Sequence, residues 1–263
     1  MTDLEKHITV SGSKGKGGGG GYRAPVEEAD SLQAIQYATL LDVVSEGPIV
    51  GLVDRDKSIY LNETPLRTSG GTLTLPGVSW QMRIGAPDQS ALPYASGAEA
   101  EIGVGAEVTN LYPKGEGPDS GCYRFSVTNE LNTRLRITLG VQGLYKQLTD
   151  QDHAGDVVAA SVGYRIVITD ADNKTIADYS RTLKGKTSSQ YLWDMTFSLK
   201  GKAPWLATVY KTSADSSSGA LVNNLYLSSY TEIIGYGFTY PNTAVIALKA
   251  SAESFGGSVP SRV

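Results

Sequence analysis

The stretch YLWDMTFSLK, residues 191–200, decides the fold class of this chain. Its apolar and aromatic side chains fall on every second position from Tyr191 to Leu199, and Asp194, Thr196, Ser198 and Lys200 alternate with them. A period of two residues is typical of a β-strand that buries one face and exposes the other. Residues 158–168 show the same alternation and run into a polar turn at residues 170–174. We therefore predict two β-strands here, with a partner strand that begins at Thr175.

The same rhythm continues outward over most of the chain. From residue 48 onward, short apolar runs alternate with Gly, Pro, Asn and Asp, a pattern typical of all-β domains. The further candidate strands are residues 49–53, 58–62, 78–84, 100–108, 122–127, 135–141, 205–211, 225–234 and 243–250. Residues 213–219 are rich in Ser, Asp and Gly and predict a solvated loop. Antiparallel sheets with so many strands curl into barrels or split into sandwiches, so we expect two β units.

One helix is predicted, over about residues 31–45. Asp30 precedes this segment and Gln33 follows three residues later, a rough capping box, while a Gly-Pro pair at 47–48 supplies the end. Val43 and Val44 are β-branched and suit a strand equally well. The helix is therefore the expectation, and a strand is its open alternative.

A glycine-rich arm precedes this segment. Residues 11–21 read SGSKGKGGGGG and contain no apolar side chain that a core could bury. Its glycines match G-x-G-x-x-G numerically, but neither a strand nor a helix closely flanks them, so a nucleotide loop is not expected. We expect an exposed arm that orders against an acidic neighbour through candidate assembly contacts at Lys14, Lys16, Tyr22 and Arg23. The alternative is that these charges only keep the arm soluble.

Composition excludes several classes of protein. The 263 residues carry 23 Lys plus Arg against 27 Asp plus Glu, so the net charge is -4, without the basic excess of a sequence-independent nucleic-acid binder. The single cysteine, Cys122, cannot form an internal disulfide, and its apolar surroundings predict a small buried side chain. His7 and His153 are too far apart in sequence to suggest a zinc cluster. The chain has 15 tyrosines and only 4 phenylalanines. Tyrosine suits positions that bury its ring but leave its hydroxyl in water, such as subunit interfaces.

Enzyme signatures are missing from the sequence. No serine stands in a G-x-S-x-G elbow, and Gly185-Lys186-Thr187 ends like a phosphate loop whose required earlier glycine is Ser180. Acidic residues that could take part in catalysis or bind a cation include Asp54 with Asp56, Glu99 with Glu101, and a cluster of Asp150, Asp152, His153 and Asp156. Such groups usually form a wet surface, and their spacing fits no EF-hand loop. We therefore predict no enzymatic activity, no metal and no cofactor.

Four stretches of the chain together resemble one known family. They are SEGPIVGLVD (45–54), KSIYLNETPL (57–66), KGKTSSQYL (184–192) and SSYTEIIGYGFTYPNTAVIAL (228–248). SAESFGGSVPSR (251–262) looks like the continuation toward a next domain. In order and approximate spacing these stretches are similar to the N-terminal region of the tip attachment protein J family, the central tail-tip or hub protein of lambda-like long-tailed phages.

This resemblance implies a mechanical role. The chain would be part of a homotrimeric hub at the distal end of the tail tube. The hub would connect the tail tube and other tip proteins to the central fibre, and take part in host attachment and DNA ejection. The tape measure protein would be a further partner. DNA would pass through its channel without specific binding, and a C-terminal region missing from this chain would contact the host receptor. The expected location is the tail tip of the virion, assembled in the host cytoplasm, and Tyr230, Tyr236 and Tyr240 are further candidate assembly contacts.

The expected fold class is mainly β, with a tail-hub β-barrel-like domain, an inserted β-sandwich, one short N-terminal helix and the arm. The expected divisions are 1–28 for the flexible arm, 29–110 for the helix and the first part of the hub domain, 111–223 for the inserted sandwich, and 224–263 for the return strands. The alternative function is a carbohydrate-binding β-sandwich module, in which Trp193 and Trp205 would stack on sugar rings. Trp193 lies on the apolar face of its strand, which argues against that alternative.

Overall fold

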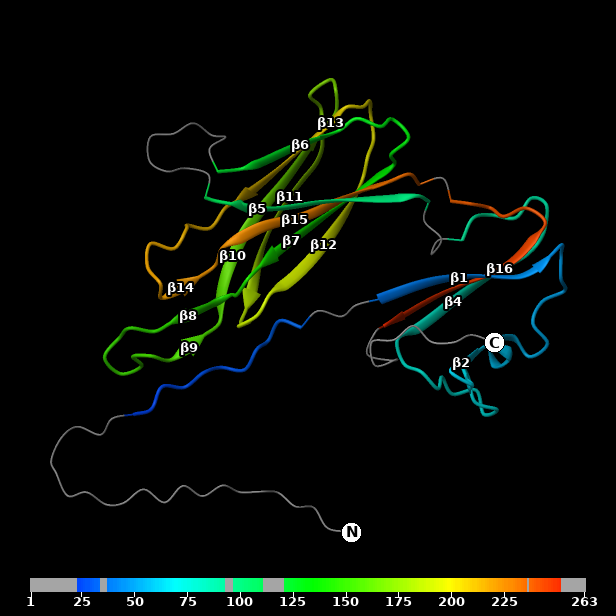
Figure 1. Ribbon diagram of the computed structural model, residues 1–263, viewed down its shortest axis with the longest axis horizontal. Helices are drawn as coiled ribbons and strands as arrows, with labels where there is room; N and C mark the ends of the chain where they lie inside the picture. Colours follow the sequence, from blue (N-terminus) through cyan, green and yellow to red (C-terminus); the bar gives the residue numbers. More distant parts are fainter. Residues whose placement is uncertain (1–22, 34–36, 93–96, 111–120, 236, 252–263) are drawn as a thin grey trace, which may run out of the picture.

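The structure is a computed structural model, and it describes residues 23–33, 37–92, 97–110, 121–235 and 237–251. In these residues the chain forms sixteen β-strands and one short 3-10 helix, arranged as several antiparallel sheets (Figure 1). The elements are β1 Tyr37–Glu46, η1 Arg55–Ser58, β2 Tyr60–Leu61, β3 Thr64–Pro65, β4 Val78–Ile84, β5 Glu99–Val108, β6 Tyr123–Val127, β7 Arg134–Val141, β8 Tyr145–Gln147, β9 Val157–Val158, β10 Ala160–Thr169, β11 Thr175–Gly185, β12 Tyr191–Ser198, β13 Trp205–Lys211, β14 Leu221–Val222, β15 Leu225–Ile233 and β16 Thr243–Ser251. The fold is mainly β, as the alternating pattern predicts. Within these same residues there is no helix of the length and apolarity that would cross a bilayer.

The larger unit is a sandwich of two four-stranded sheets. One sheet has the order β11-β10-β13-β6 and the other β12-β7-β15-β5, and their inner faces share one buried cluster. Leu139 of β7 and Ile166 of β10 are fully buried in it. Along β12 the side chains alternate between half-buried and exposed, and Trp193 packs against the cluster on the predicted face. A smaller sheet, β14-β8-β9, lies at one end of this unit (Figure 1).

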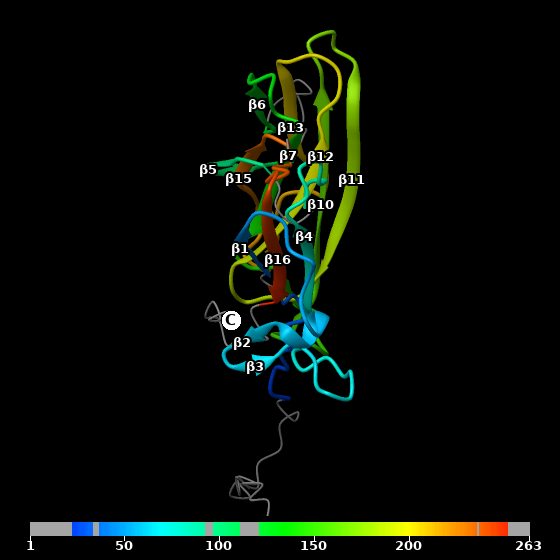
Figure 2. The ribbon, with the colours of Figure 1, turned by 90° about the vertical axis from the view of Figure 1, so that its right-hand side faces the viewer.

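The smaller unit is a three-stranded sheet with the order β1-β16-β4 (Figure 2). Its central strand β16 is buried along nearly its whole length because both faces of the sheet are apolar. Ile246 and Leu248 face a cluster with Ile59, Leu61 and Leu66. The opposite face packs Val245 and Ala247 against Leu92.

The predicted helix over residues 31–45 is wrong, because residues 37–46 form strand β1. In a strand, neighbouring side chains point to opposite faces, and Leu40 and Leu41 enter the two clusters on the two faces of the sheet. The β-branched Val43 pairs with Val245 in the ladder with β16, which is interrupted by a bulge between Val43 and Ser45. Tertiary pairing therefore overrides the rough helical pattern.

The strands of the sandwich extend past the predicted divisions at residues 110 and 223. β5 and β15 pair with each other, and β15 also pairs with β7, so both belong to a sheet of the sandwich. Residues 49–53 form no strand; Val50 and Val53 are fully exposed there. In the described residues no sheet closes into a barrel, and the three strands of the β1-β16-β4 sheet are too few to close one.

Candidate functional site: the strap and its buried lysine

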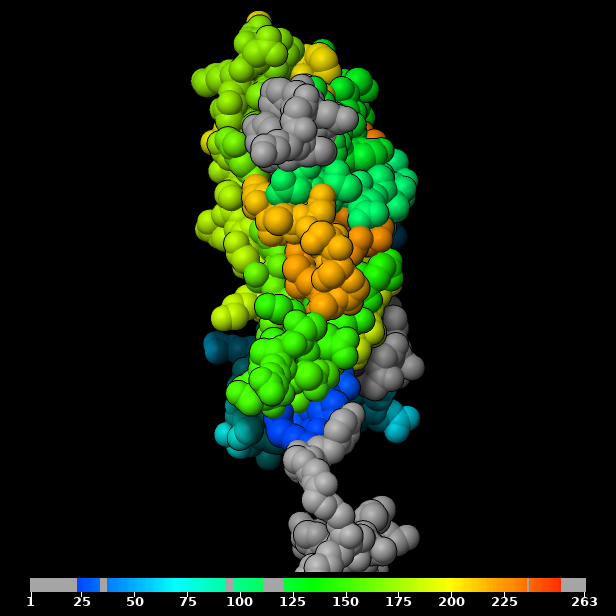
Figure 3. Space-filling model, turned by 90° about the vertical axis from the view of Figure 1, so that its left-hand side faces the viewer, coloured from blue at the N-terminus to red at the C-terminus, as the bar shows by residue number. Residues whose placement is uncertain are grey.

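Residues 23–33, which we call the strap, cross the end of the sandwich as an extended segment. The amide of Val157 donates to the carbonyl of Val26 at 2.9 Å, and the amide of Glu28 donates to the carbonyl of Val157 at 2.9 Å. Farther along, the amides of Ser31 and Leu32 both donate to the carbonyl of Lys186, at 2.9 and 3.2 Å. The strap lies at the surface below the β8–β9 region (Figure 3, dark blue below green).

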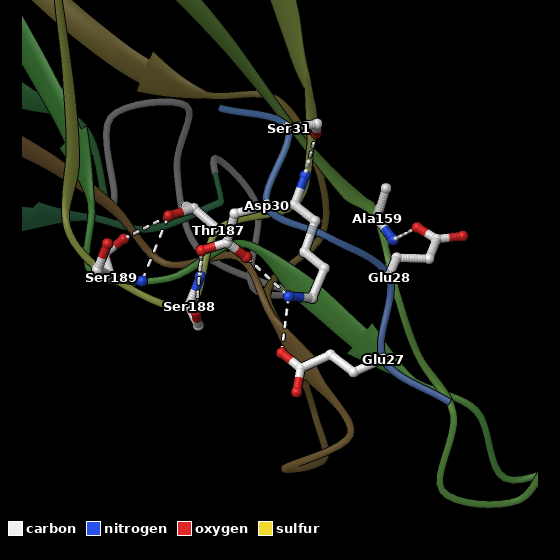
Figure 4. A network of polar contacts seen from close by, with 9 residues as sticks. Glu27, Glu28, Asp30, Ser31, Ala159, Thr187, Ser188 and Ser189 are labelled. Atoms are coloured by element: carbon white, nitrogen blue, oxygen red, sulfur yellow. Dashed lines mark hydrogen bonds and ion pairs between the residues drawn. The ribbon is translucent and has the colours of Figure 1, made fainter. Parts of the chain in front are cut away.

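The strap covers a buried lysine. The side chain of Lys186 is only 2% exposed, and its ammonium lies 2.7 Å from a carboxylate oxygen of Glu27 and 2.7 Å from one of Asp30. The other carboxylate oxygen of Asp30 accepts hydrogen bonds from the amide and the hydroxyl of Ser188. Figure 4 shows Glu27 and Asp30 converging on this ammonium from the strap. A buried ammonium is costly unless it is paired, and the strap supplies both carboxylates that pair with this one.

Asp30 and Lys186 each shift the pKa of the other. The hydrogen bond from Lys186, followed by those from Ser188, lowers the pKa of the Asp30 carboxyl below its usual value. The hydrogen bonds to Asp30 and then to Glu27 raise the pKa of the Lys186 amine. Both shifts favour the charged forms, so the ion pair persists across neutral pH.

A second ion pair holds the beginning of the strap. A guanidinium nitrogen of Arg23 lies 2.9 Å from a carboxylate oxygen of Asp156, whose other oxygen accepts the amide of Val26 at 2.7 Å. This amide is the main reason that the pKa of Asp156 is lowered, and the Arg23 guanidinium adds to the effect. Arg23 therefore meets an acidic group within its own chain.

Two glycines allow the strap to lie close to the sandwich. A Cβ at Gly155 would come within 2.8 Å of Pro25, and a Cβ at Gly185 within 2.7 Å of Leu32. Leu32 packs at the border of the main sandwich cluster. The strap thus combines an apolar contact at one end with ion pairs along its length, which suits an anchor and offers no nucleophile poised for catalysis.

The other predicted assembly contacts lie apart from the strap. Tyr230 of β15 stacks on Phe125 with ring centroids 4.0 Å apart. Tyr240, in the segment before β16, packs beside the Val245 cluster of the smaller unit. Lys14, Lys16, Tyr22 and Tyr236 lie outside the described residues. Of the seven candidates, only Arg23 belongs to the strap.

The predicted acidic groups are engaged structurally. Asp56 accepts the Arg67 guanidinium at 2.7 Å, a hydrogen bond that lowers its pKa, and Glu99 accepts Arg136 through both carboxylate oxygens. Glu101 accepts the hydroxyl of Ser229 at 2.6 Å. A general acid in a glycosidase needs a raised pKa, and the pKa of Asp56 is instead lowered. In the part of the chain that the structure describes, no three His, Cys, Asp or Glu residues are grouped to hold a metal ion.

Neither tryptophan of the carbohydrate-binding alternative forms a platform. Trp205 is 3% exposed, and its indole nitrogen donates to the carbonyl of Lys200 at 2.7 Å. Trp193 packs on the main cluster, with its ring 5.6 Å from that of Tyr164. A sugar-stacking face must be open to solvent, so the predicted use of Trp205 as a platform is wrong.

Sequence reasoning missed Lys186 as a site residue. It considered Lys186 only as the end of a phosphate loop and Asp30 only as a helix cap, whereas the two residues pair with each other across 156 positions of sequence. The available signal was a cluster of acidic residues directly after the arm, at 27–30. Nothing local in the sequence indicates which cation that cluster meets.

Comparison with known proteins gives a family. Residues 98–236, more than half of the chain, match the family model "Tip attachment protein J, FNIII-A domain", and this range spans β5 to β15. The chain is 29% identical over 245 residues to tip attachment protein J of Escherichia phage SECphi4, covering 91% of this chain and 20% of that protein. It is 28% identical over 256 residues to tip attachment protein J of Escherichia phage SECphi27, covering 95% of this chain and 20% of that protein.

Solved structures resemble the chain only weakly. The carbohydrate-binding module CBM36, solved with calcium and xylotriose, aligns with 59% of this chain and 98% of its own, at 11% identity and a TM-score of 0.26. The xylan-binding domain CBM22-1 from Paenibacillus barcinonensis Xyn10C aligns with 79% of this chain and 99% of its own, at 12% identity and a TM-score of 0.26. The chain spans about a fifth of the length of the curated relatives it matches. The match over residues 98–236 shows that this chain belongs to the tip attachment protein J family of structural phage tail-tip proteins.

Proposed function

We propose that the chain is an assembly component of a homotrimeric tail-tip hub. In this role it joins the tail tube and other tip proteins to the central fibre, and DNA passes through the hub without specific binding. The tape measure protein is a further partner in this proposal. The chain carries no catalytic function in this proposal. Host attachment and DNA ejection follow from its mechanical position, and receptor contact belongs to regions outside this chain.

One observation carries the proposal: the strap fixes the root of the glycine-rich arm to one place on the sandwich. Arg23 is held by Asp156, and Lys186 is neutralised by Glu27 and Asp30. The strap therefore has a defined path from Arg23 onward, directly after the glycine-rich sequence. An arm that cannot build a core of its own gains order only by binding another surface. A fixed attachment point for such an arm favours a role in an assembly over that of an isolated binding module.

The test compares two pairs of lysines in a phage that carries this protein. Lys14→Ala with Lys16→Ala removes two charges from the arm, and Lys200→Ala with Lys202→Ala removes two exposed charges from the sandwich as a matched control. We expect the arm variant to keep the thermal midpoint of the wild type but to yield fewer tails that contain the protein. The control variant should yield normal tails. Equal yields of infectious tails from both variants would contradict the role of the arm in assembly.

A further inference from the structure

An apolar loop in the smaller unit is exposed to solvent. We call residues 49–53, IVGLV, the tip. Val50 and Val53 are the two most exposed large apolar side chains among the described residues, at 105% and 95% exposure. In Figure 1 the chain that follows β1 runs along the right-hand edge, on the side of the smaller unit away from the sandwich. Apolar side chains in such a position contribute favourable free energy only when another molecule binds and removes them from water.

Hydrogen bonds hold both flanks of the tip in place. The amide of Gly47 donates to the carbonyl of Asn242 at 2.7 Å, and the amide of Ile49 donates to the carbonyl of Ile84 at 2.8 Å. A Cβ at Gly85 would lie 2.6 Å from the carbonyl oxygen of Gly47, so the two segments pack backbone to backbone. On the other flank, the amide of Asp54 donates to the hydroxyl of Ser58 at 3.0 Å. A loop ordered in advance loses little entropy when it binds.

A recess lies directly beside the tip. Its volume is about 470 Å³, and its lining includes the apolar side chains of Leu52, Trp80 and Met82. Arg55, Asp56 and Arg67 also line it, together with Val50 and Gly51 of the tip. Asp56 is already engaged by Arg67 at 2.7 Å, whereas Arg55 has no carboxylate partner in the described residues. The recess therefore offers an apolar floor and one arginine available for an anionic group.

We infer that the tip and the recess together bind an extended segment of another tail-tip polypeptide, in which an apolar side chain stands next to an Asp or Glu. The apolar side chain fits between Leu52 and Met82, against Trp80, and the carboxylate pairs with Arg55. Val50 and Val53 pack on the flanks of the same segment. Trp and Arg are the residue types that most often dominate the binding energy of protein interfaces, and the planar guanidinium matches a carboxylate through two hydrogen bonds. This inference rests on the assembly role proposed above and names a surface for it.

Three other occupants fit the chemistry less well. A second copy that met the tip about a two-fold axis would add its own Arg55 to the same interface, because an isologous contact uses the same patch on both copies, and this would bring a second positive charge where the site calls for a carboxylate. Nucleic acid requires several cations free for phosphates, and here one of the two arginines is committed to Asp56. A sugar would need hydrogen-bonding groups where the tip presents Val50 and Val53.

The experiment places a photo-cross-linking amino acid at position 53 of the full protein in assembled tails. We expect a cross-link to one other tail polypeptide, within a segment that has an apolar side chain beside an Asp or Glu. In the background of Arg55→Glu the yield should fall at least tenfold, and changing the partner's acidic residue to Lys should restore it. The matched control has the cross-linker at position 131, where Leu131 is a half-exposed apolar residue of the sandwich; it should not reach the same segment.

The outcomes separate this inference from the proposed function. A protein absent from the tails would overturn the assembly role itself. A protein present in the tails would overturn only the tip site if its cross-link reached its own chain, a second copy, DNA or polysaccharide. The same holds if no cross-link formed, or if Arg55→Glu left the yield unchanged. Replacing Val50 and Val53 by Ser supplies an independent readout, because both are exposed and their loss should lower incorporation into tails without changing the thermal midpoint.

Discussion

At the scale of single residues, Lys186 allows the loss of an ion pair to be distinguished from the cost of leaving a buried charge unpaired. Its ammonium is buried, but its partners Glu27 and Asp30 remain partly exposed, with side chains 62% and 37% accessible. Removing the lysine frees two carboxylates that water can solvate. Removing the carboxylates strands a buried charge, which is the costlier change.

This asymmetry gives a first prediction. Lys186→Met should leave the sandwich folded with a small change in thermal midpoint, whereas Glu27→Gln with Asp30→Asn should lower the midpoint by several degrees, because the ammonium then lacks a counter-ion. Differential scanning calorimetry of both variants checks the order. A larger loss in Lys186→Met would show that the strap does not neutralise this site.

A second prediction concerns Asp30 alone. Asp30→Asn weakens the contacts to Lys186 and Ser188, so the neighbouring strap amides of Ser31 and Leu32 should exchange hydrogen at least tenfold faster. Asp172→Asn is the matched control, because Asp172 is 70% exposed and lies 3.9 Å from the exposed Lys202. Hydrogen exchange with mass spectrometry measures both. Equal exchange in the two variants would contradict the anchoring role of Asp30.

The pH dependence of the strap follows from the directions of these shifts. The folded pKa values of Asp30 and Asp156 are lowered from about 3.8, so their stabilisation is present above that pH and is lost as the pH falls through the folded values. The folded pKa of Lys186 is raised, so its contribution is present below its usual value of 10.5 and is lost only at higher pH. Thermal midpoints measured from pH 6 to pH 2 should fall more steeply for the wild type than for Asp30→Asn with Asp156→Asn. Parallel curves would contradict this assignment.

At the scale of elements, the strands with a strict two-residue alternation were the most predictable. β4 matches its predicted bounds, and β10 and β12 lie within one or two residues of theirs, because apolar side chains on every second position mark a strand. β13 also matches its predicted bounds, although its burial does not alternate strictly. The segment of β1 is predicted as a helix because the adjacent leucines at 40 and 41 fit two structures equally well. They could lie on the apolar face of a helix, or on the two faces of a strand that is buried on both sides. The two-sided burial depends on β16, which lies some 200 residues away, so no local pattern reveals it.

The candidate site was harder to predict than the strands. Arg23 is predicted to contact an acidic neighbour in an assembly, and the structure pairs it instead with Asp156 of its own chain. The central contact between Lys186 and Asp30 joins distant segments, and the spacing of charged residues in a sequence does not encode such pairing. The exposure of the tip was missed because the run IVGLV reads as a buried strand by composition alone.

Element packing gives a further prediction about the sandwich. Leu139 is fully buried in β7, an interior strand of its sheet, so Leu139→Ala should lower the free energy of unfolding by roughly 2–5 kcal/mol. Leu131→Ala, at a residue that is 52% exposed, should change it by no more than about 0.5 kcal/mol. Urea unfolding followed by tryptophan fluorescence measures both variants. A small effect at Leu139 would contradict its place in the core between the two sheets.

At the scale of the whole molecule, β1 and β16 lie side by side although the sandwich strands stand between them in sequence (Figure 2). An insertion is topologically simple where the chain leaves and re-enters a unit at neighbouring strands. We propose on this basis that the sandwich is an insertion into the smaller unit. The strap then gives the sandwich a second tether to the preceding chain, and the tip faces away from it.

The most direct test of the proposed role is a cryo-electron microscopy map of tails from a phage that carries this protein. The assembly role predicts three copies of the β1-β16-β4 sheet and of the sandwich around the tail axis at the tip, each with its strap on Lys186. A tail tip without this protein, or a single copy placed away from the axis, would contradict it.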